Sequence, residues 1–185
     1  MPQHDHHPPL PVESATALGW KRLLAFVLLF GAFYAVLELA WTQGLSHLMI
    51  DIATVEPAAW LARQVTGDTQ IQALGSRVSS PSASINVLFG CEGTDVLMLL
   101  ASAVLVTPVP WRRRLVGAVA GCAFVFVINQ ARVVSLFLAM RSHRSWFAPL
   151  HGFVAPLLMV VLVTVFFLLW LRRAQLTTAS HAAGA

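Results

Sequence analysis

Four long runs of apolar residues dominate the chain, and short polar stretches separate them. The runs cover residues 23–41, 94–109, 115–140 and 152–171, and the third contains a polar group at residues 129–132. A helix needs about 20 apolar residues to cross a bilayer, and several of these runs reach that length. The pattern predicts an all-α integral membrane protein with about four transmembrane helices.

The polar stretches indicate how the rest of the chain is divided. Residues 1–20 and 174–185 are predicted to be cytoplasmic tails, which leaves residues 21–173 as a single transmembrane domain. Residues 44–90 are too charged to contain a further span. We therefore expect them to form a small extracytoplasmic segment. Its interrupting charges are Asp51, Glu56, Arg63 and Asp68.

Two periodicities occur within this extracytoplasmic segment. The first is helical, with Pro57 suited to the start of a helix that lies against the membrane surface or the other helices. The second alternates at residues 69–74 and again at residues 84–89, with breakers such as Gly75 between them. It predicts a short hairpin that delivers Cys91 to the membrane surface. The helical positions are Leu48, Ile52, Val55, Ala59 and Ala62.

Composition and charge support the membrane class and add a topology. The chain is 57% hydrophobic and 11% charged, which is far from a soluble domain. Its formal charge of +4 does not indicate a nucleic-acid partner, because the basic residues lie at the ends of apolar runs. The basic groups 21–22, 112–114 and 172–173 fall on one side of a four-span arrangement. This predicts a multi-pass protein of the inner membrane, with Cys91 and His151 at its outer face, although Arg141 and Arg144 break the pattern.

The chemistry of the chain is concentrated around Cys91. This thiol precedes a predicted helix whose N-terminal dipole favours the thiolate, the form that attacks a carbonyl carbon. Glu92 and Asp95 oppose thiolate formation by like charge unless a cation offsets them. Cys122 lies in an apolar run, is interpreted as a small packing residue, and is too distant in depth for a disulfide with Cys91.

Arg132 is the candidate cation. It is predicted to lie about 12 Å inside the third helix, where an arginine is costly unless it faces a polar cavity or a partner. The structural alternative is an ion pair with Glu38 or Asp95, and Glu38 is expected to face protein or the membrane interface. Asn129 lies on the same helical face as Arg132 and is a supporting candidate.

His151 is predicted to begin the fourth helix at the level of Cys91. A Cys–His pair supplies the thiolate and base of a cysteine hydrolase or acyl transferase, and Arg132 suits a tetrahedral oxyanion or a substrate carboxylate. His143 is a weaker alternative base. No metal is expected, because one Cys and one or two His make a poor zinc site, and no nucleotide-binding fingerprint occurs.

The ordered motifs resemble those of the exosortase/archaeosortase family of membrane-embedded cysteine transpeptidases. They are Gly90-Cys91-Glu92-Gly93, a basic loop, Asn129-Gln130-Ala131-Arg132 and His151, and the resemblance covers about residues 89–173. It implies that Cys91 is the nucleophile, Arg132 the stabilising arginine and His151 the proton-transfer residue. The implied substrates are exported proteins with a C-terminal motif, a transmembrane helix and a basic tail, cleaved through a thioester without a cofactor. The short chain indicates a compact subfamily.

Two rival interpretations stay open. One is a non-enzymatic membrane protein, such as a transporter subunit or an assembly factor, in which Arg132 has a structural role. The other is a thiol redox protein, which the lack of a Cys-x-x-Cys pair disfavours.

Overall fold

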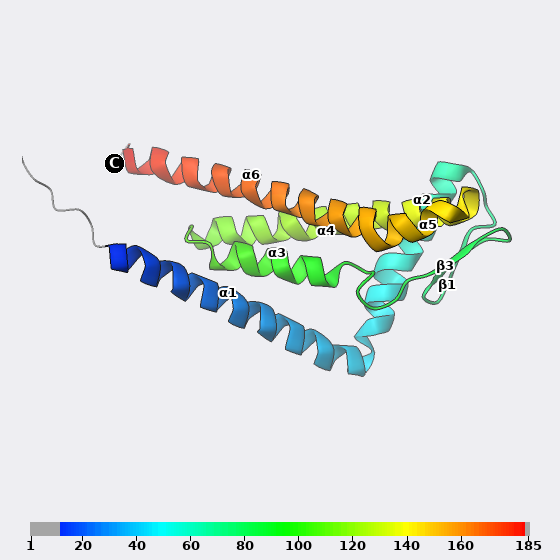
Figure 1. The fold of residues 1–185 in the computed structure, drawn as a ribbon, viewed down its shortest axis with the longest axis horizontal. Coiled ribbons are helices and arrows are strands. Elements are labelled where there is room, and N and C mark those ends of the chain that lie inside the picture. The colour runs from blue at the N-terminus through cyan, green and yellow to red at the C-terminus, as the bar shows by residue number, and fades with distance from the viewer. Residues whose placement is uncertain (1–11, 184–185) are drawn as a thin grey trace, which may run out of the picture.

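The computed structural model describes residues 12–183, and most of these residues lie in helices. Three helical segments are long and apolar enough to cross a membrane, namely Gly19–Leu45, Trp111–Ser142 and Arg144–Gln175. The long elements run roughly side by side along the molecule (Figure 1). They are α1 (Val12–Ala40), α3 (Thr94–Val106), α4 (Trp111–Ser142) and α6 (Ala155–Ala183).

The second predicted span is shorter than expected. Helix α3 has 13 residues, or about 20 Å of helix, against about 30 Å of hydrocarbon in a bilayer. It ends because Thr107 precedes Pro108 and takes an extended conformation, with φ −67° and ψ 134°. Three helical segments of sufficient length to span a membrane are therefore present in the described residues, and a fourth span remains a prediction.

Helix α4 continues without interruption through the polar group at residues 129–132. The interruption suggested by the sequence is absent. The Asn129 and Gln130 side-chain N–H groups donate to backbone carbonyls of neighbouring segments. The side-chain oxygens of both amides are buried and have no partner among the described residues.

The segment after α1 folds into helical turns that cross one end of the bundle (Figure 1). Two π-helical stretches, η1 (Trp41–Leu45) and η2 (His47–Val55), meet at a kink where Gly44 has a φ of 94°. Helix α2 (Glu56–Thr66) follows, with a proline in its first turn as predicted. Of the predicted apolar face, Val55, Ala59 and Ala62 are buried, whereas Leu48 and Ile52 are exposed.

The predicted hairpin is a three-stranded antiparallel sheet. The strands β1 (Gln72–Leu74), β2 (Arg77–Ser79) and β3 (Ser84–Asn86) are ordered β1-β2-β3, with Val78 opposite both Ala73 and Ile85. The sequence analysis missed β2, because this strand has three residues and lies between breakers. Val78 and Ile85 are buried, so one face of the sheet packs against the helices.

The segment before the last long helix is helical rather than a loop. Helix α5 (Arg144–Pro149) and the π-helical turn η3 (Leu150–Val154) run directly into α6. The break in the chain is at His143, with φ −143° and ψ 76°. His151 therefore lies within a long helical segment, two turns after its start, and not at the first position that the sequence analysis assigned to it.

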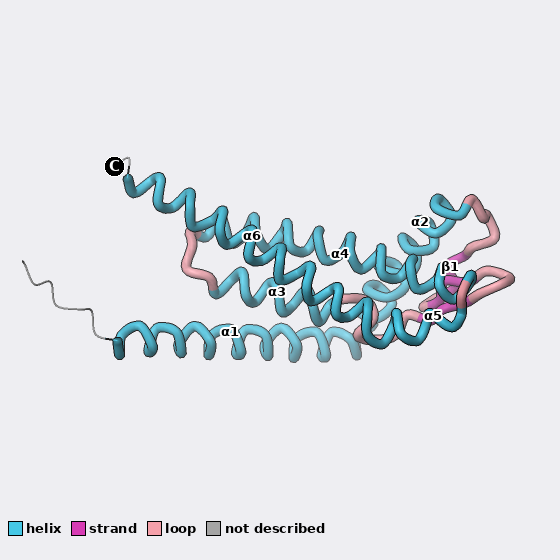
Figure 2. The backbone as a smooth tube through the Cα atoms, turned by 45° about the horizontal axis from the view of Figure 1, so that its top comes forward, coloured by secondary structure: helices cyan, strands magenta, loops and turns pink. Residues whose placement is uncertain are grey.

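The two ends of the molecule differ in content. The start of α1, the α3–α4 connection and the end of α6 lie at one end, and η2, α2, α5 and the sheet lie at the other (Figures 1 and 2). The basic groups 112–114 and 172–173 belong to the first turn of α4 and the C-terminal part of α6. We call these the basic end and the sheet end.

Each end has its own cluster of buried apolar residues. The sheet-end core joins η2, α2 and the sheet to the C-terminal half of α4, and it consists of Ile50, Val55, Ala58, Ala59, Ala62, Ile71, Val78, Ala83, Ile85, Val87, Val133, Val134, Leu136 and Phe137. The bundle core joins α3, α4 and α6, and it consists of Leu100, Val104, Val125, Met159 and Val163.

Candidate functional site

Cys91 lies in a tight loop between β3 and α3. Its backbone N–H donates to the carbonyl of Leu88 at 2.9 Å, and its side chain is half-buried against the sheet-end core. Gly90 and Gly93 flank the loop, both with a φ of 83°, which side chains rarely tolerate. A Cβ on Gly93 would also lie 3.1 Å from Cγ of Asn129. The loop is therefore held by backbone geometry and by close contact with α4.

Glu92 anchors this loop and does not face solvent beside the thiol. Its side chain is 8% exposed and accepts a hydrogen bond from Oγ1 of Thr94 at 2.6 Å. Its backbone oxygen accepts a hydrogen bond from Nδ2 of Asn129 at 2.9 Å. Asn129 precedes Arg132 by one helical turn. The contact therefore attaches the Cys91 loop to α4 one turn from the candidate cation.

Gln130 is a second anchor, which the sequence analysis did not single out. Its Nε2 donates to the carbonyl of Ala53 in η2 at 3.0 Å, and its side chain is almost fully buried. Two consecutive amides on α4 thus hold two separate segments of the sheet end. The sequence contained an indication of this role, because burying two consecutive amides inside an apolar helix is costly unless they form hydrogen bonds.

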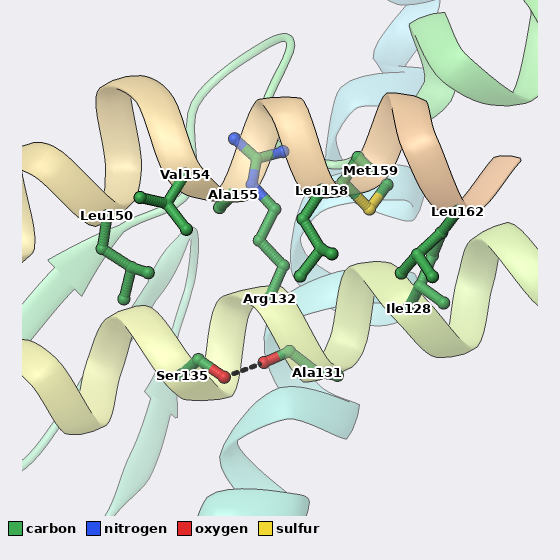
Figure 3. Close-up of a pocket in the computed structure, with 10 residues that line it drawn as sticks. All are labelled: Ile128, Ala131, Arg132, Ser135, Leu150, Val154, Ala155, Leu158, Met159 and Leu162. Atoms are coloured by element: carbon green, nitrogen blue, oxygen red, sulfur yellow. Dashed lines mark hydrogen bonds between the residues drawn. The ribbon is translucent and has the colours of Figure 1, made fainter. Parts of the chain in front are cut away.

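Arg132 extends from α4 into an apolar cavity of about 170 Å³ beneath η3 and α6. Figure 3 shows its side chain reaching from the α4 ribbon past Ala155 and Leu158, with the guanidinium level with the ribbon of the helix that carries them. The Nε atom is buried and has no hydrogen-bond partner within the described part of the chain. The sequence analysis expected a polar cavity or a partner for this arginine, whereas the cavity that it enters has mostly apolar walls.

The predicted ion-pair alternatives for Arg132 are wrong within residues 19–175, whose side chains are described. The ion pairs there are His47–Asp51 and Arg141–Asp68. Glu38 is exposed on α1, and a Cβ on Gly90 would lie 3.6 Å from a carboxylate oxygen of Asp95, which places that acid beside the Cys91 loop. An arginine without a carboxylate partner is costly in an apolar cavity.

His151 lies on the helical segment that covers the Arg132 cavity. Its ring stacks on Phe147, with centroids 5.5 Å apart and planes 5° from parallel. Its Nδ1 is buried and has no hydrogen-bond partner among the described residues. Leu150, which directly precedes it, and Val154, three residues after it, line the cavity. The alternative base, His143, is exposed at the break between α4 and α5.

The three candidate residues are grouped around the C-terminal half of α4, but their side chains are not bonded to one another. Cys91, Phe147 and Leu150 all pack against the sheet-end core, and Leu150 also lines the Arg132 cavity. Among the described residues, no hydrogen bond joins Cys91, Arg132 and His151. Catalytic hydrogen bonds are often long before substrate binds, so this geometry is compatible with a resting site.

The environment of the second cysteine differs from the predicted one. Cys122 is exposed on α4 and does not pack in the interior. It also lines a small cavity of about 90 Å³ with Glu92, Asn129 and Gln130. Both cysteines are free thiols.

Arg141, one of the two arginines that break the predicted positive-inside pattern, forms an ion pair at the sheet end. Arg141, at the C-terminal end of α4, lies 2.9 Å from a carboxylate oxygen of Asp68, in the connection between α2 and β1. The pair holds the α2–β1 connection against α4. Arg141 therefore has a local partner at the sheet end.

No group of three His, Cys, Asp or Glu side chains suited to a metal occurs in the part of the chain with described side chains. Comparisons with family models, with curated proteins and with solved structures give no match. The resemblance to exosortases therefore rests on the sequence motifs, and the geometry above is an independent observation beside it.

Proposed function

We propose that this protein is a membrane-embedded cysteine transpeptidase or protease that cleaves C-terminal sorting signals of exported proteins. The observation that carries the proposal is the placement of Arg132. Its guanidinium lies in an apolar cavity without a carboxylate partner among the described residues, one helical turn from the anchor of the Cys91 loop. Donors held in an apolar site are suited to stabilise charge that develops during a reaction.

In the proposed reaction, the Cys91 thiolate attacks the carbonyl carbon of the scissile peptide bond. Arg132 donates hydrogen bonds to the resulting oxyanion, and His151 gives a proton to the leaving amine as the carbon–nitrogen bond breaks. The acyl group is then a thioester on Cys91. Water or an amine attacks this thioester, His151 accepts the proton of the nucleophile, and the Cys91 thiolate leaves. No metal or cofactor takes part.

The substrates we propose carry a short motif, one transmembrane helix and a basic tail. A substrate helix lying in the bilayer presents its motif at the membrane surface, and the sheet end with the Cys91 loop would face the same surface. The substrate's basic tail would then lie on the side of this protein's own basic end, under the positive-inside rule. In this proposal the protein resides in the inner membrane, with the sheet end at the outer face.

The test is co-expression with candidate substrates of this design, followed by mass analysis of their new C-termini. Cys91→Ala should abolish processing at normal protein abundance, and the matched control Cys122→Ala should retain it. Arg132→Lys keeps the charge but loses the planar fork of donors, so processing should fall about 100-fold or more. Processing that persists in Cys91→Ala would refute a cysteine mechanism.

The non-enzymatic alternative, a transporter subunit or an assembly factor, predicts a different outcome. It requires Arg132 to act as a structural charge, so Cys91→Ala would be silent and Arg132→Lys would behave as wild type. The structure offers Arg132 neither Glu38 nor Asp95 as an ion-pair partner within the described side chains. We therefore favour the enzymatic function.

A further inference from the structure

The small cavity that Cys122 lines, of about 90 Å³, lies between η2, the start of α3 and the middle of α4. Its lining contains one carboxylate and no basic residue. Apart from the thiol, which is a weak hydrogen-bonding group, its polar side chains are five, and each is at most 8% exposed. They are Thr54, Glu92, Thr94, Asn129 and Gln130.

The orientation of the two amides in this lining is fixed by their nitrogens. Nδ2 of Asn129 donates to the backbone carbonyl of Glu92 at 2.9 Å, and Nε2 of Gln130 donates to that of Ala53 at 3.0 Å. Exchanging oxygen and nitrogen in either amide would bring two oxygens into contact, so the hydrogen bonds determine the assignment. The amide oxygens, Oδ1 of Asn129 and Oε1 of Gln130, are buried and have no partner among the described residues.

Glu92 contributes a third buried acceptor to the same cavity. Its Oε1 accepts a hydrogen bond from Oγ1 of Thr94, whereas its Oε2 has no partner within the described part of the chain. The ion pairs between described side chains do not include Glu92. The N-terminus of α3 supplies only about half a positive charge, which leaves the carboxylate partly unbalanced. A buried carboxylate is costly unless a positive charge compensates it.

The two threonine hydroxyls of the lining can add further oxygen ligands. Oγ1 of Thr54 donates its proton to the carbonyl of Met49 at 2.8 Å, and Oγ1 of Thr94 donates its proton to Glu92 at 2.6 Å. Each hydroxyl therefore keeps its oxygen lone pairs for another group. The cavity is thus lined by acceptor oxygens with a total charge of one negative unit.

We propose that this cavity binds a monovalent alkali metal cation through Oε2 of Glu92, Oδ1 of Asn129 and Oε1 of Gln130. A single water molecule donates two hydrogen bonds and brings no charge, so it satisfies neither the three acceptors nor the carboxylate. Calcium prefers about six to eight oxygen ligands and would leave an excess positive charge in a buried site. This site differs from the zinc site that the sequence disfavours, because its ligands are oxygens. The bound ion would join the Cys91 loop to α4, and it does not depend on the proposed function.

The test uses the full chain, purified in a neutral detergent with the bulky organic cation choline as the only added cation. Choline chloride is replaced stepwise by sodium chloride or potassium chloride at constant ionic strength, and the apparent melting temperature is recorded. We expect at least one of the two metal ions to raise this temperature by about 3–6 °C at ten times its dissociation constant. Equal melting temperatures in choline, sodium and potassium would overturn the proposal.

Glu92→Gln removes the negative charge and keeps the oxygen that Thr94 contacts. Its new amide N–H group can donate to the acceptors of the cavity, so the variant should be at least as stable as the wild type in choline. It should lose the response to the metal ions. The matched control is Glu56→Gln, which removes the same charge from an exposed position at the start of α2 and should retain the response.

Three results of this experiment would contradict the cation site. An equal response in Glu92→Gln and the wild type would show a general salt effect. A loss of the response in Glu56→Gln as well would show attraction to net charge. A larger rise with calcium chloride than with the alkali salts at equal ionic strength would indicate a divalent site. If Glu92→Gln does not accumulate, the comparison of choline with sodium and potassium on the unaltered chain decides the proposal.

Discussion

The sheet end and the bundle of this protein are packed by different physical means. At the sheet end, the buried core draws on η2, α2, the strands β2 and β3 and α4, and Val55, Ile71 and Phe137 are completely buried. In the bundle, the buried core consists of five residues, and the most apolar window of α1 is 0% buried. The sheet end has a well-buried apolar core, whereas the bundle leaves most of its apolar surface exposed.

The difference is the one expected if the sheet end meets water and the bundle meets lipid. In water, burying apolar side chains is favourable by about 25 cal/mol per Å². Lipid tails are as apolar as leucine, so helices in a bilayer associate through close packing of small residues and through polar contacts. The Cys91 loop rests on the sheet-end core and is attached to α4. The candidate site is thus supported by the better packed of the two regions.

The largest expected effect concerns the orientation of the two ends. If the sheet end is outside and the basic end is inside, a reporter fused at Gly75 and one fused at Ala185 should report opposite compartments. The three basic groups provide the physical reason, since they resist translocation. The measurement is the activity of an export-dependent enzyme at each fusion point, in an all-or-none comparison. Activity of the export-dependent reporter fused at Ala185 would contradict the proposed topology.

The second prediction tests close packing at the basic end. Gly117→Ala should destabilise the protein by about 1–3 kcal/mol, because its Cβ would lie 2.3 Å from the Trp170 ring and the two helices would have to separate. The control is Gly31→Ala on α1, where a Cβ meets nothing within 4 Å. Thermal unfolding in lipid nanodiscs measures both variants. Equal stability of the two would show that α4 and α6 do not depend on this contact.

A matched pair on one helix sharpens the comparison of the two cores. Val133 and Val125 both lie on α4 and are both 3% exposed, but Val133 belongs to the sheet-end core and Val125 to the bundle core. Val133→Ala should cost about 2 kcal/mol, from two buried methyl groups at roughly 0.8 kcal/mol each plus a cavity term. Val125→Ala should cost about half as much, since lipid replaces water as the reference solvent. Unfolding midpoints in nanodiscs decide the comparison, and a larger cost at Val125 would contradict it.

The smallest expected effect is at the ion pair between Arg141 and Asp68. Both side chains are partly exposed, so Asp68→Asn should lower stability by only about 0–1 kcal/mol. The loss should shrink as salt is added, because exposed charges are screened. Melting curves at low and high ionic strength provide the measurement. A loss of several kcal/mol, independent of salt, would mean that this pair is a principal support of the sheet end.

The candidate site was only partly predictable from the sequence. Arg132 was identified because an arginine inside an apolar helix is costly, and the structure gives it a cavity. Its environment was not predictable, because the apolar walls come from η3 and α6, more than 15 residues later in the chain. Glu92 was expected to influence the thiol electrostatically, yet Thr94 and Asn129 hold it as an anchor. A single sequence does not show which polar side chain meets which backbone group.

The sequence by itself determined the features that depend on local composition. Apolar runs of sufficient length specify long helices, Pro57 specifies a helix start, and alternation specifies strands near the predicted positions, because each depends only on neighbouring residues. Tertiary structure alone decided the features that depend on distant partners. It placed β2 beside β3, made His151 part of a continuous helical segment, and attached the Cys91 loop to α4 through Asn129. These features arise from hydrogen bonds and packing between segments that the order of residues does not bring together.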